Sequence, residues 1–425
     1  MKTLDQIAAE LQGYDPNALP ADAVDEFLSR LVEPVAQTER VCLFDALDRV
    51  LAADLIAPLS VPPHDNSAMD GYAFDGAQLQ AGQGLALRVV GTAHAGAAWQ
   101  GEAGAGQCVK IMTGAVMPAG LDTVVPLELT RVEGEWVELP ADALRAGDNR
   151  RLLGEDLLAG QPALLAGTRI GPAALGLIAS LGLAEVTVRR RVRVAFFSTG
   201  DEILSLGQAP REGAVYDSNR YTLFGLLRRL GVELIDLGAV ADRDDSLEAA
   251  FRQAASMADA VITSGGVSVG EADHTKAVMR RLGEMAFWRI AMRPGRPMAV
   301  GRLRQAERSA LLFGLPGNPV AVMVTFLAFV RPALLRLMGA SQTQPLRVTA
   351  RSEQAMRKKP GRTEFQRGIA GRAADGDLRV RSTGSQGSGV LRSMAEANCL
   401  IRLDHAQGNV AVGDPVELLL FDGLI

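Results

Sequence analysis

Residues 193–339 alternate between short apolar runs and amphipathic stretches, which constrains the fold more than any other feature of the chain. The pattern predicts strands at 194–197, 233–237, 260–263 and 311–313, and helices at 219–230, 246–257, 273–282 and 319–338. Strand–helix–strand units of this kind form right-handed crossovers and a largely parallel sheet, with ligand groups at the carboxyl ends of the strands. We therefore expect an α/β domain over 191–339 with a site along that edge.

The flanking regions have other periodicities. Apolar residues at helical spacing predict amphipathic helices at 21–35 and 46–55, and residues 150–188 are predicted to return to helix, with Pro172 at a helix start. Short β-rich pieces separated by glycine-rich turns predict a small β domain at 58–147. We expect a multidomain α/β protein, divided into an N-terminal helical and linker domain (1–57 and 148–190), an inserted β domain (58–147), the α/β domain (191–339) and a C-terminal β domain (340–425).

The composition limits the classes of function. A chain of 425 residues with 48% hydrophobic and 22% charged residues is typical of a soluble protein of two to four domains. Its net charge of −5 gives no general attraction to nucleic acid or to anionic membranes. No run of about 18 apolar residues or signal-peptide core is visible, and the three cysteines lie far apart. We expect a cytoplasmic protein without a structural zinc site.

A glycine loop follows the strand predicted at 260–263. It contains Gly265, Gly266 and Gly270, and it leads through Asp273 into a helix. Free backbone N–H groups and a helix N-terminus suit a phosphate, although a glycine pair alone is more often an ordinary tight turn. Four side chains in the same loop add possible cation ligands: Ser264, Ser268, Glu271 and Asp273. The loop therefore offers both anion donors and ligands for Mg²⁺.

Three further loops lie at the same predicted edge. The first carries Asp201 and Glu202, the second carries Asp242, and the third carries Pro316, Gly317 and Pro319. A lone acidic pair often only caps a helix, and proline is common at a first helical turn. Neighbouring carboxylates at one sheet edge nevertheless need a cation or a proton to coexist. The convergence of the loops predicts one site.

A local basic segment surrounds two prolines. Arg289, Arg293 and Arg296 lie beside Pro294 and Pro297. Such a run is compatible with a solvated face, but in a chain of negative net charge it favours a local oxyanion site, because guanidinium groups match tetrahedral oxyanions. Walker A, GxGxxG and HExxH motifs are absent from the sequence. The remaining motifs indicate a site that binds phosphate and metal and that does not use a histidine as a base.

These motifs together resemble the molybdopterin molybdenumtransferases, the MoeA and gephyrin E-domain family. The resemblance rests on residues 65–73 (DNSAMDGYA), 111–114 (IMTG), 154–156 (GED), 198–202 (STGDE), 264–273 and 314–319 (GLPGNP), in family order over nearly the whole chain. It implies a central MogA/MoaB-like molybdopterin-binding α/β sandwich, an inserted β domain, a helical N-terminal layer and a C-terminal β-barrel-like domain. It also implies a homodimer with the active site between the subunits.

The implied reaction is Mg²⁺-dependent insertion of molybdate into adenylylated molybdopterin, which releases AMP and forms molybdenum cofactor. By resemblance, Asp273, Glu202 and Asp242 would hold Mg²⁺ and would be catalytic together with Asp70, Thr113 and Asp156. Substrate would contact Asp201, Ser264, Gly265, Gly266, Ser268, Pro316, Gly317 and Pro319. Molybdate would lie at Arg293, Arg296, Pro297, Arg367 and Ser388. Further partners would be the molybdopterin adenylyltransferase and molybdoenzyme-maturation proteins.

The sequence departs from the family pattern at several positions. Ala321 stands where serine is frequent, and His64 stands where phenylalanine is frequent. Arginines replace the lysines usual in the molybdate motif, which keeps the charge but changes the donor geometry. Two other functions stay open at this point: a molybdopterin adenylyltransferase, which would consume ATP, and a non-catalytic pterin-binding scaffold.

Overall fold

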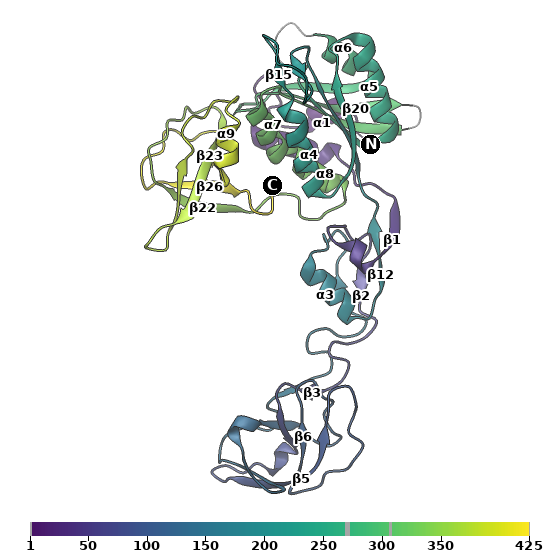
Figure 1. Cartoon of the computed structure of the whole chain (residues 1–425), viewed down its shortest axis with the longest axis vertical. Helices are drawn as coiled ribbons and strands as arrows, with labels where there is room; N and C mark the ends of the chain where they lie inside the picture. The colour runs from purple at the N-terminus through teal and green to yellow at the C-terminus, as the bar shows by residue number, and fades with distance from the viewer. Residues whose placement is uncertain (1, 268–272, 306–307, 425) are drawn as a thin grey trace.

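The computed structural model describes residues 2–267, 273–305 and 308–424 of the chain. The molecule is elongated, with the α/β domain and the C-terminal β domain at one end and the inserted β domain at the other (Figure 1). A small linker domain joins the two ends. The shape matters for function because it separates groups that the sequence motifs had suggested belong together.

The central domain contains a six-stranded sheet in the order β16-β13-β17-β21-β20-β18. Its strands are β13 (Arg193–Thr199), β16 (Glu233–Val240), β17 (Ala260–Ser264), β18 (Gly283–Arg289), β20 (Pro297–Gln305) and β21 (Arg308–Leu315). The first four in spatial order are parallel, which confirms the prediction, because β13 pairs in parallel with β16 and β17, and β17 with β21. The antiparallel strands β18 and β20 extend this sheet and were not predicted.

Helices cover both faces of the central sheet. They are α4 (Ser218–Leu230), α5 (Asp244–Met257), α6 (Asp273–Leu282), α7 (Pro319–Thr325), the π-helical turn η4 (Phe326–Val330) and α8 (Arg331–Leu337). One face packs Phe197 against Phe251 of α5, and the other packs Phe196 and Phe313 with α4 and α7. The stretch Pro319–Leu337 is apolar and long enough to cross a membrane, but 89% of its most apolar window is buried inside the protein. We interpret it as a core helix.

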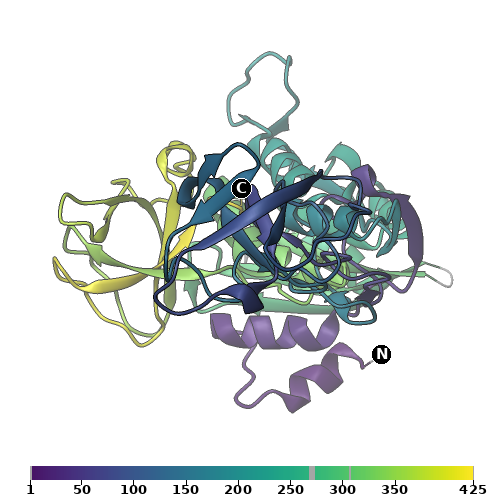
Figure 2. The same ribbon diagram turned by 90° about the horizontal axis from the view of Figure 1, so that it is seen from below.

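The N-terminal helices α1 (Leu4–Glu10) and α2 (Ala21–Leu31) belong to this central core. Leu4, Val24 and Phe27 are buried in the same apolar cluster as the strand residues Phe196 and Phe313. Figure 2 shows the two helices as an outer layer on one side of the molecule. The helix predicted at 21–35 is thus confirmed as α2, and it ends four residues earlier than predicted.

The linker domain corrects two helix predictions. Residues 46–55 are not an α-helix, because only the short 3₁₀ helix η1 (Leu43–Ala46) precedes turns and isolated bridges. Asp48 has a φ of 63°, which no α-helix accommodates, and Val50 and Leu51 bridge to Arg169 and Val188. Residues 150–188 contain one helix, α3 (Pro172–Ser180), and otherwise form turns and the strands β10 (Arg150–Arg151), β11 (Pro162–Leu164) and β12 (Glu185–Arg189), so the prediction of helix there was largely wrong. The two chain segments of the linker domain are joined by two antiparallel strand pairs. These are β1 (Thr38–Cys42) with β12, and β2 (Leu55–Ile56) with β11.

The inserted domain is a six-stranded sheet in the order β7-β4-β6-β5-β9-β8. Its strands are β4 (Gly71–Phe74), β5 (Leu85–Ala93), β6 (Gln107–Ile111), β7 (Thr123–Pro126), β8 (Arg131–Glu133) and β9 (Trp136–Leu139), and all lie within the range expected for the β domain. Separate apolar clusters cover its two faces, with Val109 in one and Val137 in the other. The short strand β3 (Asn66–Ser67) pairs with β10 where the domain joins the linker.

The C-terminal domain is a closed five-stranded barrel, as the resemblance implied. Its strands are β22 (Arg347–Ser352), β23 (Thr363–Arg372), β24 (Leu378–Ser382), β25 (Cys399–Leu403) and β26 (Pro415–Leu420). The ring closes because β23 pairs with both β24 and β25. The short strand β19 (Met292–Arg293), from the basic segment of the central domain, adds to β23 in parallel. This pairing brings Arg293 to the junction of the two domains.

Candidate functional site

The carboxyl edge of the central sheet carries a buried polar network. Ser198 and Ser264 face each other in register at the ends of β13 and β17, and their Oγ atoms lie 2.9 Å apart. The Ser198 hydroxyl also lies 3.0 Å from Oδ1 of Asp217, to which it donates, and all three residues are buried. The network therefore fixes the start of the glycine loop to the residue that precedes α4.

Asp217 and Asn219 were not predicted as site residues. Asp217 caps α4 by accepting from the backbone N–H of Arg220, and Asn219 Nδ2 donates to the carbonyl of Gly317 over 2.7 Å. Four buried polar atoms near this edge have no hydrogen-bond partner within the described residues: Asp217 Oδ2, Asn219 Oδ1, Thr199 Oγ1 and Thr263 Oγ1. Because buried polar atoms are normally paired, this concentration indicates a place for a polar ligand.

The glycine loop adopts a backbone that requires glycine at two positions. Gly265 and Gly266 have φ values of 95° and 69°. A Cβ atom would lie 2.4 Å from the Thr199 carbonyl oxygen at Gly265 and 2.4 Å from Thr275 Oγ1 at Gly266. Glycine is therefore required at both positions, because the loop packs directly against β13 and α6. Ser268 lies outside the described residues, as does the side chain of Asp273, although Asp273 itself begins α6.

The predicted carboxylates lie on loops around this edge. Glu202 and Asp201 are exposed after β13, and the Glu202 carboxylate lies over Gly200, whose added Cβ would come within 2.5 Å of Glu202 Oε2. Asp242 accepts a hydrogen bond of 3.3 Å from Thr275, the threonine that also packs against Gly266. Within the described ranges, no three His, Cys, Asp or Glu side chains form a cluster that could hold a metal ion by themselves.

The basic segment forms a pocket with the proline loop. We call this the inner pocket; its volume is about 550 Å³, and it lies between the central and C-terminal domains. It brings together four of the five residues predicted for molybdate (Arg293, Arg296, Pro297 and Ser388) and two predicted for substrate (Pro316 and Gly317), and it adds Arg362 and Ala321. Pro319 is half-buried at the first position of α7, directly after this loop. The structure thus gathers three guanidinium groups around a polar cavity.

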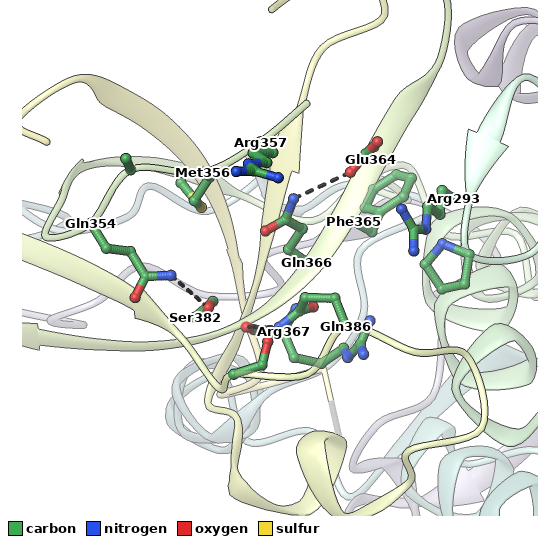
Figure 3. A pocket seen from close by; sticks show the side chains of 13 residues that line it. Arg293, Gln354, Met356, Arg357, Glu364, Phe365, Gln366, Arg367, Ser382 and Gln386 are labelled. Atoms are coloured by element: carbon green, nitrogen blue, oxygen red, sulfur yellow. Dashed lines mark hydrogen bonds between the residues drawn. The ribbon is translucent and has the colours of Figure 1, made fainter. Parts of the chain in front are cut away.

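Arg367 lines a second, adjoining pocket of about 300 Å³, which we call the outer pocket (Figure 3). Its side chain is buried and donates from Nε to Ser393 Oγ and from Nη2 to the carbonyls of Ser385 and Gly387. Burial lowers the pKa of Arg367 to about 10, with a further contribution from the charge of Arg293. Arg367 is therefore charged at neutral pH, and it fixes the loop that presents Ser388.

Three predicted catalytic residues lie away from this edge. Asp70 and Thr113 belong to the inserted domain, and Asp156 is exposed in the linker beside it, with its N–H donating to Val61. Thr113 donates to Asp70 Oδ1 from its backbone N–H (2.6 Å) and its hydroxyl (2.7 Å), which lowers the pKa of Asp70. Figure 1 shows the inserted domain at the opposite end of the molecule from the central domain. A single chain does not bring these residues to the inner pocket.

Comparison with known families matches each part of the chain. Residues 20–182 match the MoeA N-terminal region (domain I and II), residues 195–336 match the probable molybdopterin binding domain, and residues 349–421 match the MoeA C-terminal region (domain IV). The chain is 41% identical to the molybdopterin molybdenumtransferase of Haemophilus influenzae, with 95% of this chain and 99% of the relative covered.

The chain belongs to the molybdopterin molybdenumtransferase family. The protein is therefore a transferase of molybdenum cofactor biosynthesis. The relative from Bacillus subtilis is 33% identical over 93% of both chains. A solved MoeA protein from Pyrococcus horikoshii superposes with a TM-score of 0.79 at 26% identity and covers 95% of this chain and 100% of its own. These matches confirm the multidomain architecture that the motifs implied.

Proposed function

We propose that this protein inserts molybdate into adenylylated molybdopterin, cleaves the adenylate with Mg²⁺ and releases AMP. The observation that supports this most directly is the contact between two sites of different chemistry. Asn219, in the polar edge with its unpaired atoms, donates to the Gly317 carbonyl, and Gly317 lines the basic inner pocket. A phosphate on the glycine loop and a tetrahedral oxyanion in the inner pocket would therefore lie side by side.

The residues present fit a magnesium ion that is held partly by substrate. Mg²⁺ is usually bound by one or two carboxylates together with phosphate oxygens and water. Glu202 and Asp242 lie on neighbouring loops and would supply such carboxylates, with Asp273 at the start of α6 as the third candidate from the sequence. The bound ion would neutralise charge on the phosphate during cleavage. The surrounding glycine loop would hold the phosphate in position through its backbone N–H groups.

The proposal includes a homodimer. Asp70 and Thr113 are remote from the inner pocket in their own chain, so their participation requires the inserted domain of a second subunit (Figure 1). Large apolar side chains that a monomer leaves in solvent support an interface: Phe44 is 97% exposed, and Tyr221 and Phe224 on α4 are 47% and 48% exposed. A cytoplasmic location and transient contacts with the adenylyltransferase and with maturation proteins complete the proposal.

A product assay tests the function. Purified protein is mixed with adenylylated molybdopterin, Mg²⁺ and molybdate, and AMP is quantified by chromatography. We expect AMP release that depends on molybdate and stops when Mg²⁺ is chelated. ATP consumption with free molybdopterin would instead identify an adenylyltransferase. Tight binding of the adenylylated pterin with no molybdate-stimulated AMP would identify a scaffold, and either result would overturn the proposal.

A further inference from the structure

The outer pocket contains an arginine that no motif had singled out. Arg357 lies in the segment that follows β22, and its side chain lines this pocket together with Arg293 and Arg367 (Figure 3). Arg293 and Arg367 are already part of the predicted molybdate site, but Arg357 is not. The outer pocket also shares Arg293, Pro294 and Gln386 with the inner pocket. The two pockets are thus adjoining chambers that meet at Arg293.

The backbone on both sides of Arg357 is fixed. Met356 and Lys358 are both 4% exposed, and Met356 exchanges two backbone hydrogen bonds of 2.9 Å with Val410. The Lys358 ammonium group donates to three carbonyls, those of Lys359, His405 and Gln407. With its two neighbours pointing into the C-terminal domain, Arg357 is exposed on the side of the pocket. The backbone that carries this guanidinium group is therefore held in place beside the pocket.

Four of the five arginines that line the two chambers have no carboxylate partner within the described residues, whereas the fifth, Arg362, pairs with Glu364. Arg293, Arg296, Arg357 and Arg367 form no ion pair with a carboxylate in the described part of the chain, whereas Arg351 and Arg379 of the same barrel pair with Asp377 and Asp375. A set of unpaired guanidinium groups in a chain with a net charge of −5 favours a bound anion. Arg293, Arg357 and Arg367 line the same pocket, and the charge of Arg293 contributes to the lowered pKa of Arg367.

One carboxylate lies in the outer pocket but opposes an anion only weakly. Glu364 is 3% exposed, and among the described lining residues it is the single acidic side chain. Arg362 donates to its Oε1 from Nε over 2.8 Å, and Gln366 Nε2 donates to Oε2 over 3.2 Å. Both oxygens are therefore occupied, and the ion pair with Arg362 compensates the negative charge. The remaining field in the chamber is positive.

We propose that the outer pocket is an entry chamber for the oxyanion, in which Arg357 captures a tetrahedral dianion such as molybdate before Arg293 passes it to the inner pocket. The identity of the anion rests on the proposed function, while the chamber itself rests on the unpaired arginines. Loss of Arg357 would then weaken oxyanion capture without touching the nucleotide side of the cleft.

The test is a calorimetric titration of the full-length protein with molybdate at low salt. We expect Arg357→Gln to weaken molybdate binding by about three- to tenfold, and Arg357→Lys to restore most of it because the charge is kept. The matched control is Arg381→Gln, an exposed arginine of β24 that lines neither pocket. The difference between wild type and Arg357→Gln should shrink in about 0.5 M salt, because screening weakens long-range attraction.

Binding by Arg357→Gln as tight as wild type would overturn the inference. A second measurement needs no variant: crystals of the wild-type protein grown with tungstate should show tungsten in the outer pocket, and tungsten confined to the inner pocket would also refute the entry chamber. The titration measures binding and does not depend on turnover. The entry chamber and the proposed reaction can therefore be refuted independently of each other. A salt-dependent loss of binding in Arg357→Gln would support the chamber even if no AMP were released.

Discussion

The carboxylate of Asp70 receives both of its hydrogen bonds from Thr113, one from the backbone N–H at 2.6 Å and one from the hydroxyl at 2.7 Å. The pair lies at one edge of the inserted sheet, where β4 begins and the antiparallel β6 ends. Both residues are exposed, so the pair faces outward from its own domain. The two hydrogen bonds hold the carboxylate in one orientation at the surface of the domain.

Thr113→Val tests this arrangement. Removing the hydroxyl keeps the backbone bond but frees the carboxylate to rotate, and we expect AMP release to fall by about tenfold, as is typical when a supporting hydrogen bond is lost. The pKa of Asp70 should rise toward its ordinary value, which NMR titration of the side chain would measure. Thr113→Ser retains the hydroxyl and is the control. Full activity of the valine variant would show that the hydroxyl bond has no functional role.

Asp273→Asn tests the acidic loops. We expect this variant to lose at least about 100-fold in AMP release at saturating Mg²⁺, because a neutral amide supplies neither the charge nor the ligand of a carboxylate. Circular dichroism should show an unchanged fold. Asp245→Asn, in the first turn of α5 and exposed, is the matched control. AMP release at the wild-type rate by Asp273→Asn would refute the assignment.

Asp217→Ala tests the polar network at the sheet edge. The substitution removes the cap of α4 and the acceptor of the Ser198 hydroxyl, both on Oδ1. We expect the free energy of unfolding to fall by about 2 kcal/mol, since losing a helix cap costs about 1 kcal/mol and losing a buried hydrogen bond to a carboxylate costs a similar amount. Urea denaturation would measure the change. Asp217→Asn keeps an acceptor and should recover most of the loss; equal stability of alanine variant and wild type would contradict the network.

Asp25 on α2 predicts a pH dependence of stability. Burial raises its pKa to about 7, with Asp22 adding to the shift and Arg347, Arg336 and Arg402 opposing it. The pKa of Asp25 is higher in the folded than in the unfolded protein. Its contribution to the free energy of unfolding is therefore fully present below about pH 4 and is lost as the pH rises through about 7. Asp25→Asn should therefore stabilise the protein at pH 8 by on the order of 1 kcal/mol and by much less at pH 5. Urea denaturation at both pH values would measure this, and a variant less stable than wild type at pH 8 would contradict it.

The sequence was most informative where strands are buried on both faces. The parallel strands β13 and β17 are continuous apolar runs, so their positions and the polar residues at their ends could be predicted within one or two residues. The linker domain was harder, because its alanine- and leucine-rich segments have a helical composition. Turns with positive φ, such as Asp48, and single bridges decide its structure instead.

The candidate site was predictable at the level of loops but not of contacts. Arg367 was expected to hold molybdate, and the structure shows that most of its hydrogen bonds are used inside the barrel, which no spacing reveals. Asn219 had the appearance of a residue at the start of a helix, and its bond to Gly317 depends on the packing of α4 against α7. The distance between Asp70 and the central sheet depends on how the linker folds. Such long-range relationships come from tertiary structure alone.

The separation of the inserted domain from the central domain has a genetic consequence. If each cleft combines the inserted domain of one chain with the central domain of the other, two defective chains can complement each other. A dimer that pairs an Asp70→Ala chain with an Asp273→Asn chain would contain one cleft with both defects and one cleft with neither. Co-expression of these two inactive alleles should therefore restore a fraction of the wild-type activity, whereas two alleles altered in the same domain should not.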